Sequence, residues 1–127
     1  MRIATVLPAA FGLLVALSGC KAADPFANIT PAARGEATTI FATRCTPCHG
    51  AGGRGDGPAS AGLTPKPRNF TDPKWQGGVT DEHLEKIIQY GGSAVGKSPA
   101  MPSNPDLMSK PEVVSALRAH VRSLKQE

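Results

Sequence analysis

Hydrophobic and polar positions alternate with a helical period in the C-terminal half of the chain. Over residues 80–90 the apolar side chains recur three or four positions apart, which places them on one face of a helix. These side chains are Leu84, Ile87 and Ile88. Thr80 can cap the first turn, and Gly91-Gly92 ends the pattern. The pattern predicts an amphipathic helix over residues 80–90.

A second stretch with the same period follows Ser109. Its apolar positions are Val113, Val114, Leu117, Val121 and Leu124. Ser109 and Glu112 have the spacing of a capping box, and Pro111 falls in the first turn, where a missing N–H is tolerated. We therefore expect a last helix that begins after Ser109.

A third helix is expected over residues 31–48. Thr30 suits the N-cap position, a proline follows at the first helical position, and Ile40 with Phe41 gives an apolar patch. Residues 58–78 contain several prolines and show no regular period, so we expect them to be irregular. Helices joined by long loops indicate an all-α fold.

The N-terminal stretch has the pattern of an export signal. Arg2 precedes an uncharged apolar run over residues 3–17. As a helix this run would span about 22 Å, which is shorter than the hydrocarbon core of about 30 Å. It ends in Leu17-Ser18-Gly19-Cys20, which resembles the lipobox of bacterial lipoproteins, with cleavage before Cys20 and lipid added to that residue. The alternative is a plain secretory signal that leaves an extra cysteine.

These boundaries divide the chain into a removed signal peptide over residues 1–19, a lipidated tether over residues 20–30 and one domain over residues 31–127. The tether has little periodicity, so we expect it to be extended and mobile. Lipid on Cys20 predicts attachment to the periplasmic side of a bacterial membrane, and more than one acyl chain makes such anchoring stable.

The chemistry of the chain concentrates in Cys45-Thr46-Pro47-Cys48-His49. On a helical turn the Cys45 and Cys48 thiols point the same way, so both can form thioethers with the two vinyl groups of one haem. His49 follows directly, and a neutral imidazole is a normal axial ligand of haem iron. The motif predicts one covalently bound haem c.

Two other readings use the same residues. A C-x-x-C pair also occurs in thiol redox proteins, but there it lies between a strand and a helix, and no strand pattern precedes Cys45. A structural zinc site could use Cys45, Cys48 and His49 with His83 or His120 as the fourth ligand, but such sites usually show a second pair of ligands at short spacing. The glycine-rich stretch over residues 50–57 formally matches a dinucleotide fingerprint. We reject that match for want of a preceding strand, and expect the glycines to allow tight turns.

Composition and charge bear on the number of domains, on the core and on the kind of partner. Removal of nineteen of the 127 residues leaves 108, one domain by size, and aromatic residues make up only 5% of the chain. A haem would supply the large apolar group that such a core lacks, so we expect the haem-free form to be poorly folded. The full chain carries a net charge of +4, which gives no case for nucleic-acid binding.

The second axial ligand is expected in Ser98-Pro99-Ala100-Met101-Pro102. A methionine thioether opposite a histidine raises the potential of the iron. Met101 lies in a loop flanked by prolines between two predicted helices, where its side chain can be held rigidly. Met108 is the competing candidate, and either methionine could instead fill a gap in the core.

Residues 31–124 resemble the class I cytochrome c family. The resemblance rests on Phe41 before the haem motif, the motif itself, Gly55-Asp56-Gly57-Pro58, Met101-Pro102 and the ending Val121-Arg122-Ser123-Leu124. It implies a small all-α fold of three or more helices wrapped around one haem, with His49 and Met101 as axial ligands. It also implies that the first and last helices cross closely, and that a proline carbonyl after the motif, here Pro58, orients His49.

Two positions depart from the family pattern. Ala37 stands at the helix crossing where the family often has glycine, and His120 stands where the last helix often has tyrosine or tryptophan. We expect His120 to pack against Phe41 or Ala37, which leaves the haem ligands untouched.

The function that this resemblance implies is that of a one-electron carrier between membrane or periplasmic redox proteins. With both axial positions filled, the iron would bind no small-molecule substrate, so we do not expect an enzyme. The alternative is a haem-based ligand sensor or weak peroxidase, with an open iron site if Met101 does not bind the iron.

Overall fold

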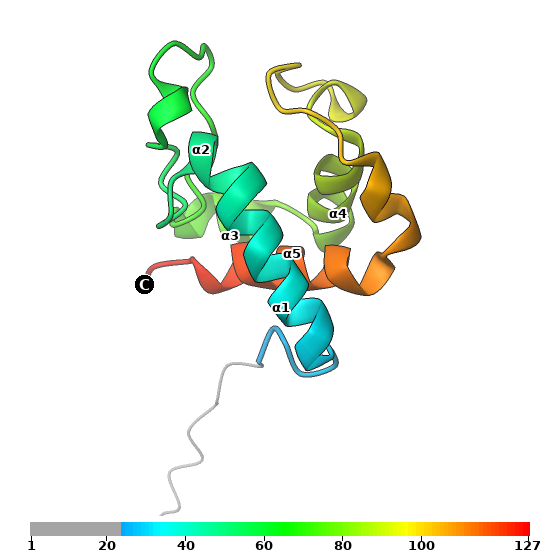
Figure 1. Cartoon of the computed structure of the whole chain (residues 1–127). Helices are drawn as coiled ribbons and strands as arrows, with labels where there is room; N and C mark the ends of the chain where they lie inside the picture. The colour runs from blue at the N-terminus through cyan, green and yellow to red at the C-terminus, as the bar shows by residue number, and fades with distance from the viewer. Residues whose placement is uncertain (1–23) are drawn as a thin grey trace, which may run out of the picture.

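The computed structural model describes residues 24–127, and within this part of the chain it contains helices and loops but no strand. The longer helices are α1 (Pro31–Ile40), α4 (Asp81–Tyr90) and α5 (Pro111–Ser123), and the shorter ones are α2 (Thr46–His49) and α3 (Pro73–Gly78). Short turns of other helix types complete the set: η1 (Phe41–Cys45), η2 (Pro58–Ser60), η3 (Ser93–Val95) and η4 (Pro105–Ser109). The all-α prediction is confirmed (Figure 1).

The first helix runs through α1, η1 and α2 without a break, as predicted. Thr30 caps it by accepting a hydrogen bond from the Ala33 N–H. Its middle part, η1, is a π-helical turn in which the Thr46 N–H donates to the Phe41 carbonyl. Pro47 has no N–H to donate, so the regular pattern of α-helical hydrogen bonds is interrupted where the haem motif begins.

The core lies where α1 crosses α5. Small residues permit the close approach, since Ala37 is 2% exposed and Ala116 is fully buried. The apolar side chains buried around them are Ile40, Phe41, Val113, Val114, Leu117 and Val121. The ring of His120 lies on that of Phe41 with 4.2 Å between centroids, so the prediction for His120 is confirmed. Burial lowers the pKa of His120.

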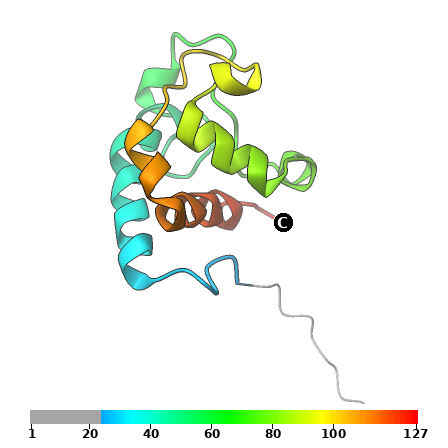
Figure 2. The ribbon, with the colours of Figure 1, turned by 90° about the vertical axis from the view of Figure 1, so that its right-hand side faces the viewer.

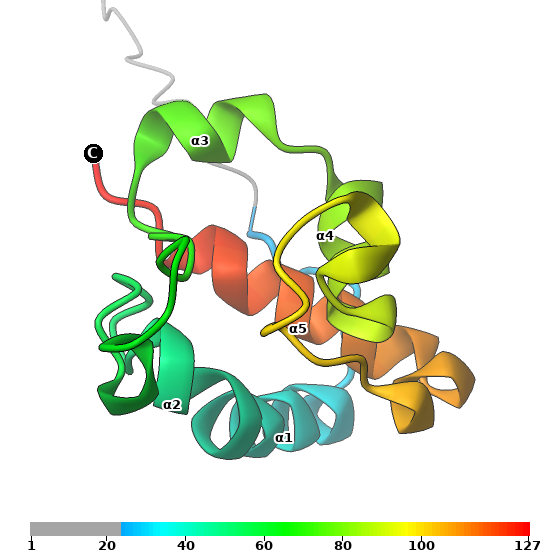
Figure 3. The same ribbon diagram turned by 90° about the horizontal axis from the view of Figure 1, so that it is seen from above.

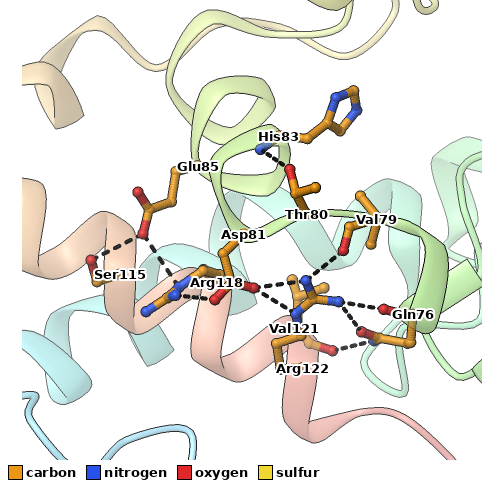
Figure 4. A network of polar contacts seen from close by, with 10 residues as sticks. All are labelled: Gln76, Val79, Thr80, Asp81, His83, Glu85, Ser115, Arg118, Val121 and Arg122. Atoms are coloured by element: carbon orange, nitrogen blue, oxygen red, sulfur yellow. Dashed lines mark hydrogen bonds and ion pairs between the residues drawn. The ribbon is translucent and has the colours of Figure 1, made fainter.

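Helix α4 packs on α5 and is fixed there by ion pairs (Figure 4). Thr80 caps α4 by accepting from the His83 N–H, and Leu84 is buried. At the start of α4, Asp81 binds both Arg118 and Arg122 of α5. Partial burial alone would raise the pKa of Asp81, but the hydrogen bonds and charges of the two arginines outweigh it and hold that pKa below its usual value.

Two predictions about local structure were wrong. Helix α3 lies in the stretch expected to be irregular, because Asp72 caps it and Pro73 occupies its first position. Ser109 and Glu112 form no capping box, since the N-cap of α5 is Lys110 and no side chain caps it. The Glu112 carboxylate instead accepts a hydrogen bond of 2.8 Å from the Thr30 N–H, which ties the start of α5 to the start of α1.

The end of the expected tether differs from the prediction. Residues 25–28 form a turn. Arg34 of α1 donates to the carbonyls of Phe26 and Ile29 and lies over the Phe26 ring. Figures 1 and 2 place this segment at the opposite end of the molecule from the loop over residues 91–104. In residues 24–127 no helix is long and apolar enough to cross a membrane. The expected signal peptide and Cys20 lie outside the described residues.

Candidate haem site

The two thiols of the motif lie one helical turn apart. Cys45 ends η1 and Cys48 lies in α2, and both are free and half-buried. Burial raises the pKa of the Cys45 thiol to about 11, although the charge of Arg44 opposes this. A redox-active dithiol needs a thiol whose pKa is lowered, so this environment argues against the thiol redox alternative.

His49 is buried at the end of α2, and in residues 24–127 only its Nδ1 has a hydrogen-bond partner. Its Nδ1 lies 3.1 Å from the Arg68 carbonyl oxygen. A carbonyl can only accept, so Nδ1 must carry the proton and the lone pair must lie on Nε2. Burial lowers the pKa of His49, which keeps the ring neutral, and the bond to Arg68 only partly opposes this. Among the described residues no hydrogen bond reaches Nε2, so it is free to bind a metal.

The carbonyl that orients His49 is not the one predicted. Pro58 starts η2, whereas the acceptor belongs to Arg68, further along the chain. Phe70 adds a second contact, with its ring stacked on that of His49 at 4.3 Å between centroids and 17° between planes. Arg68 acts through its backbone, which every residue has, so no sequence signal could single it out.

The glycine-rich stretch folds back onto α2. The N–H groups of Gly55 and Gly57 donate to the carbonyls of His49 and Cys48 over 2.8 and 3.1 Å. Gly50 and Gly55 have φ of 78°, a backbone conformation that favours glycine. The predicted tight turns are confirmed, and they bring this loop against the backbone of the haem motif.

Gly57 lies so close to the backbone of the first helix that one added methyl group should destabilise the protein strongly. A Cβ on Gly57 would lie 2.4 Å from the Pro47 carbonyl oxygen and 2.5 Å from that of Thr46, and backbone atoms cannot move aside cheaply. We expect Gly57→Ala to lower the free energy of unfolding by about 1–3 kcal/mol or more, measured by urea denaturation of the haem-loaded protein.

Gly62→Ala is the matched control, because a Cβ there meets nothing within 4 Å. It should change stability by less than about 0.5 kcal/mol. Equal stability of the Gly57→Ala and Gly62→Ala proteins would contradict the close packing of this loop on α2.

Met101 lies in the loop that follows α4. Its carbonyl accepts a 3.0 Å hydrogen bond from the Gly92 N–H, and its side chain is half-buried. Asn104 anchors the end of the loop, since its N–H and Nδ2 donate to the Gln89 and Ile88 carbonyls, each over 2.8 Å. In Figures 1 and 3, α2 and this loop lie on the same upper face of the molecule, α2 on the left and the loop on the right.

Polar contacts join this loop to the helix that carries Cys45. The Arg44 guanidinium donates to Asp106 over 2.9 Å and to the Asn104 side chain over 3.2 Å. Met108, the competing candidate, lies in η4, where its side chain is 48% exposed. The Met101 loop is therefore anchored at both ends, at Gly92 and at Asn104, and Arg44 links its end and η4 to the first helix.

The zinc alternative finds no support. In residues 24–127 no group of three or more His, Cys, Asp or Glu side chains could hold a metal ion. His120 packs on Phe41 at the helix crossing, and the half-buried His83 lies in the first turn of α4. Neither histidine supplies a fourth ligand beside Cys45, Cys48 and His49.

The donor set at the end of the first helix, in η1 and α2, fits a haem c. Two unpaired thiols one turn apart match two vinyl groups, and the adjacent imidazole has its lone pair on the unpartnered Nε2. The family model described as Cytochrome c matches residues 32–125. Neither a curated protein nor a solved structure matches the chain. The chain therefore belongs to the class I cytochrome c family, whose members bind covalently attached haem c and carry electrons.

Proposed function

We propose that this protein is a one-electron carrier with a single haem c, attached through Cys45 and Cys48 and bound at the iron by His49 and Met101. The observation that carries the proposal is the state of His49, whose Nδ1 donates to the Arg68 carbonyl and whose Nε2 is left with the lone pair. When bound, the haem supplies the reversible change of its iron between the ferrous and ferric states.

In this function the role of the protein is to position the haem and its iron ligands. Cys45 and Cys48 fix the haem on the first helix, and the Arg68 carbonyl holds the His49 ring in one orientation and makes it a better electron donor. A second strong axial ligand leaves the metal no open position for a substrate. This is why we propose a carrier and not an enzyme.

Met101 is the better supported of the two methionines. Its loop is held at the Gly92 N–H, and beyond it by Asn104 and Arg44, so the backbone that carries Met101 has a defined place. Met108 lies in η4, outside the loop between Gly92 and Asn104. A thioether ligand raises the potential of the iron, so we propose a carrier of comparatively high potential.

A potentiometric titration tests the proposed function. The haem-loaded protein should follow a one-electron Nernst curve, oxidise and reduce reversibly, and exchange electrons rapidly with small redox dyes. A protein that carries no haem, or whose haem turns over peroxide faster than it exchanges electrons, would not be a carrier.

We further propose that the mature protein is anchored by lipid on Cys20 to the periplasmic side of a bacterial membrane, where it exchanges electrons with other redox proteins. The proposal rests on the lipobox-like Leu17-Ser18-Gly19-Cys20. A Cys20→Ser variant should move from the membrane fraction to the soluble fraction with its haem retained. An unchanged distribution would refute the lipid anchor and leave the carrier function standing.

A further inference from the structure

A buried amide joins α3 to the last helix. Gln76 is only 5% exposed, and its Nε2 donates to the Phe70 carbonyl over 2.7 Å. The same nitrogen donates to the Val121 carbonyl over 2.8 Å (Figure 4). A buried amide is expensive to leave unpaired, and here both of its hydrogens are used. Gln76 therefore binds the segment around Phe70 to α5.

Arg122 fixes which way this amide points. Its Nη1 donates to the backbone carbonyl and the Oε1 of Gln76 over 2.7 and 3.0 Å. Its other donors go to the Val79 carbonyl and to Asp81, which balances the charge. Because Oε1 accepts from Arg122, the Gln76 NH2 group must face the Phe70 carbonyl. The guanidinium holds this orientation from several sides.

The Phe70 carbonyl belongs to the segment that holds His49. Two residues earlier, the Arg68 carbonyl accepts from His49 Nδ1, and the Phe70 ring itself is stacked on the imidazole. On the other side, the Phe70 N–H donates to the Gly53 carbonyl over 2.7 Å. Phe70 is thus held by Gly53 through its N–H and by Gln76 through its carbonyl. A shift at Gln76 would therefore disturb the two contacts that this segment makes with His49, the hydrogen bond from Nδ1 and the stacked Phe70 ring.

We propose that Gln76, oriented by Arg122, is a positioning residue for His49 and thereby lowers the reduction potential of the iron. The inference rests on the proposed role of His49 as axial ligand. A hydrogen bond from Nδ1–H to a carbonyl increases the electron donation of the imidazole, which favours the ferric state. Loosening the Arg68–Phe70 segment weakens that bond, so the potential rises.

The test replaces Gln76 with methionine, which is unbranched and of similar size but donates no hydrogen bond. The haem-loaded Gln76→Met protein should have a higher reduction potential than wild type, and the His49 Nδ1 proton should exchange with solvent faster by NMR. Arg122→Lys is a milder second variant, since one ammonium group cannot bind Gln76, Val79 and Asp81 at once. Arg122→Lys should also raise the reduction potential and the Nδ1 exchange rate, but by less than Gln76→Met does.

Val114→Ala controls for a general loss of stability. Val114 lies on α5 and is buried in the apolar core around the crossing of α1 and α5. This variant should lower the melting temperature and leave the potential and the Nδ1 exchange rate at wild-type values. If Val114→Ala shifts them as Gln76→Met does, the effect is general loosening and the inference is overturned.

The remaining outcomes are also decisive. The Gln76→Met and Arg122→Lys proteins could both keep the wild-type reduction potential and the wild-type Nδ1 exchange rate. That result would overturn the positioning role of Gln76 and leave the carrier function standing. A wild-type protein without covalent haem, or with haem that His49 does not bind, would overturn the proposed function and the inference with it. NMR of the wild type alone identifies that case, because no iron-shifted His49 signal would appear.

Discussion

A protein in which Cys45 and Cys48 are both replaced by alanine is expected to carry no covalent haem. The two thiols lie one turn apart beside the His49 imidazole, and the third cysteine of the chain, Cys20, is far earlier in the sequence. The loss should be complete, whereas each single variant can retain one thioether bond. Extraction with acidified acetone followed by mass spectrometry of the polypeptide measures the haem that stays attached.

The double variant should also be poorly folded. Cys45 packs against the buried core from its edge, and the chain has few large side chains to replace a porphyrin. Cys20→Ser is the matched control and should keep its haem and its cooperative unfolding. Covalent haem retained by the Cys45→Ala/Cys48→Ala protein would refute this attachment site.

Met101→Ala is expected to remove the second axial ligand. The weak long-wavelength band of sulfur bound to ferric iron should disappear, and the potential should fall by a sizeable part of the range of about 0.8 V that axial ligands span. Imidazole and carbon monoxide should then bind readily. Optical spectra of the oxidised and reduced protein, with a potentiometric titration, measure all of these changes.

Met108→Ala is the control for this experiment. Because Met101 is the proposed ligand, removal of the Met108 side chain from η4 should leave the band and the potential as in wild type. If the band is lost in Met108→Ala and kept in Met101→Ala, the two methionines exchange roles. If wild type has no such band, neither is a ligand and the sensor or peroxidase alternative becomes the better account.

The parts of the fold that could be predicted are those governed by local rules. The helical period predicted α4 and α5, the Thr80 cap predicted the start of α4, and Thr30 with the proline after it predicted the start of the first helix. Each of these signals lies within or beside the element it describes. The position of His120 on Phe41 followed from the resemblance. Helix α3 also had a local signal in Asp72-Pro73, but the many prolines around it concealed that signal.

The parts that could not be predicted depend on contacts between distant residues. His49 binds a backbone carbonyl at Arg68, and any residue type could supply one. Gln76 looks like an ordinary polar residue until Phe70 and Val121 are brought to it. Glu112 fits a capping box by spacing alone, yet its carboxylate binds the Thr30 N–H, because the crossing of α1 and α5 offers that partner.

The measurement that tests the central claim most directly is the optical spectrum of the reduced, haem-loaded protein before and after exposure to carbon monoxide. The account predicts a low-spin c-type spectrum that carbon monoxide leaves unchanged, because His49 and Met101 fill both axial positions. A high-spin spectrum, or a band that shifts with the gas, would show an open iron site and contradict the assignment of this protein as an electron carrier.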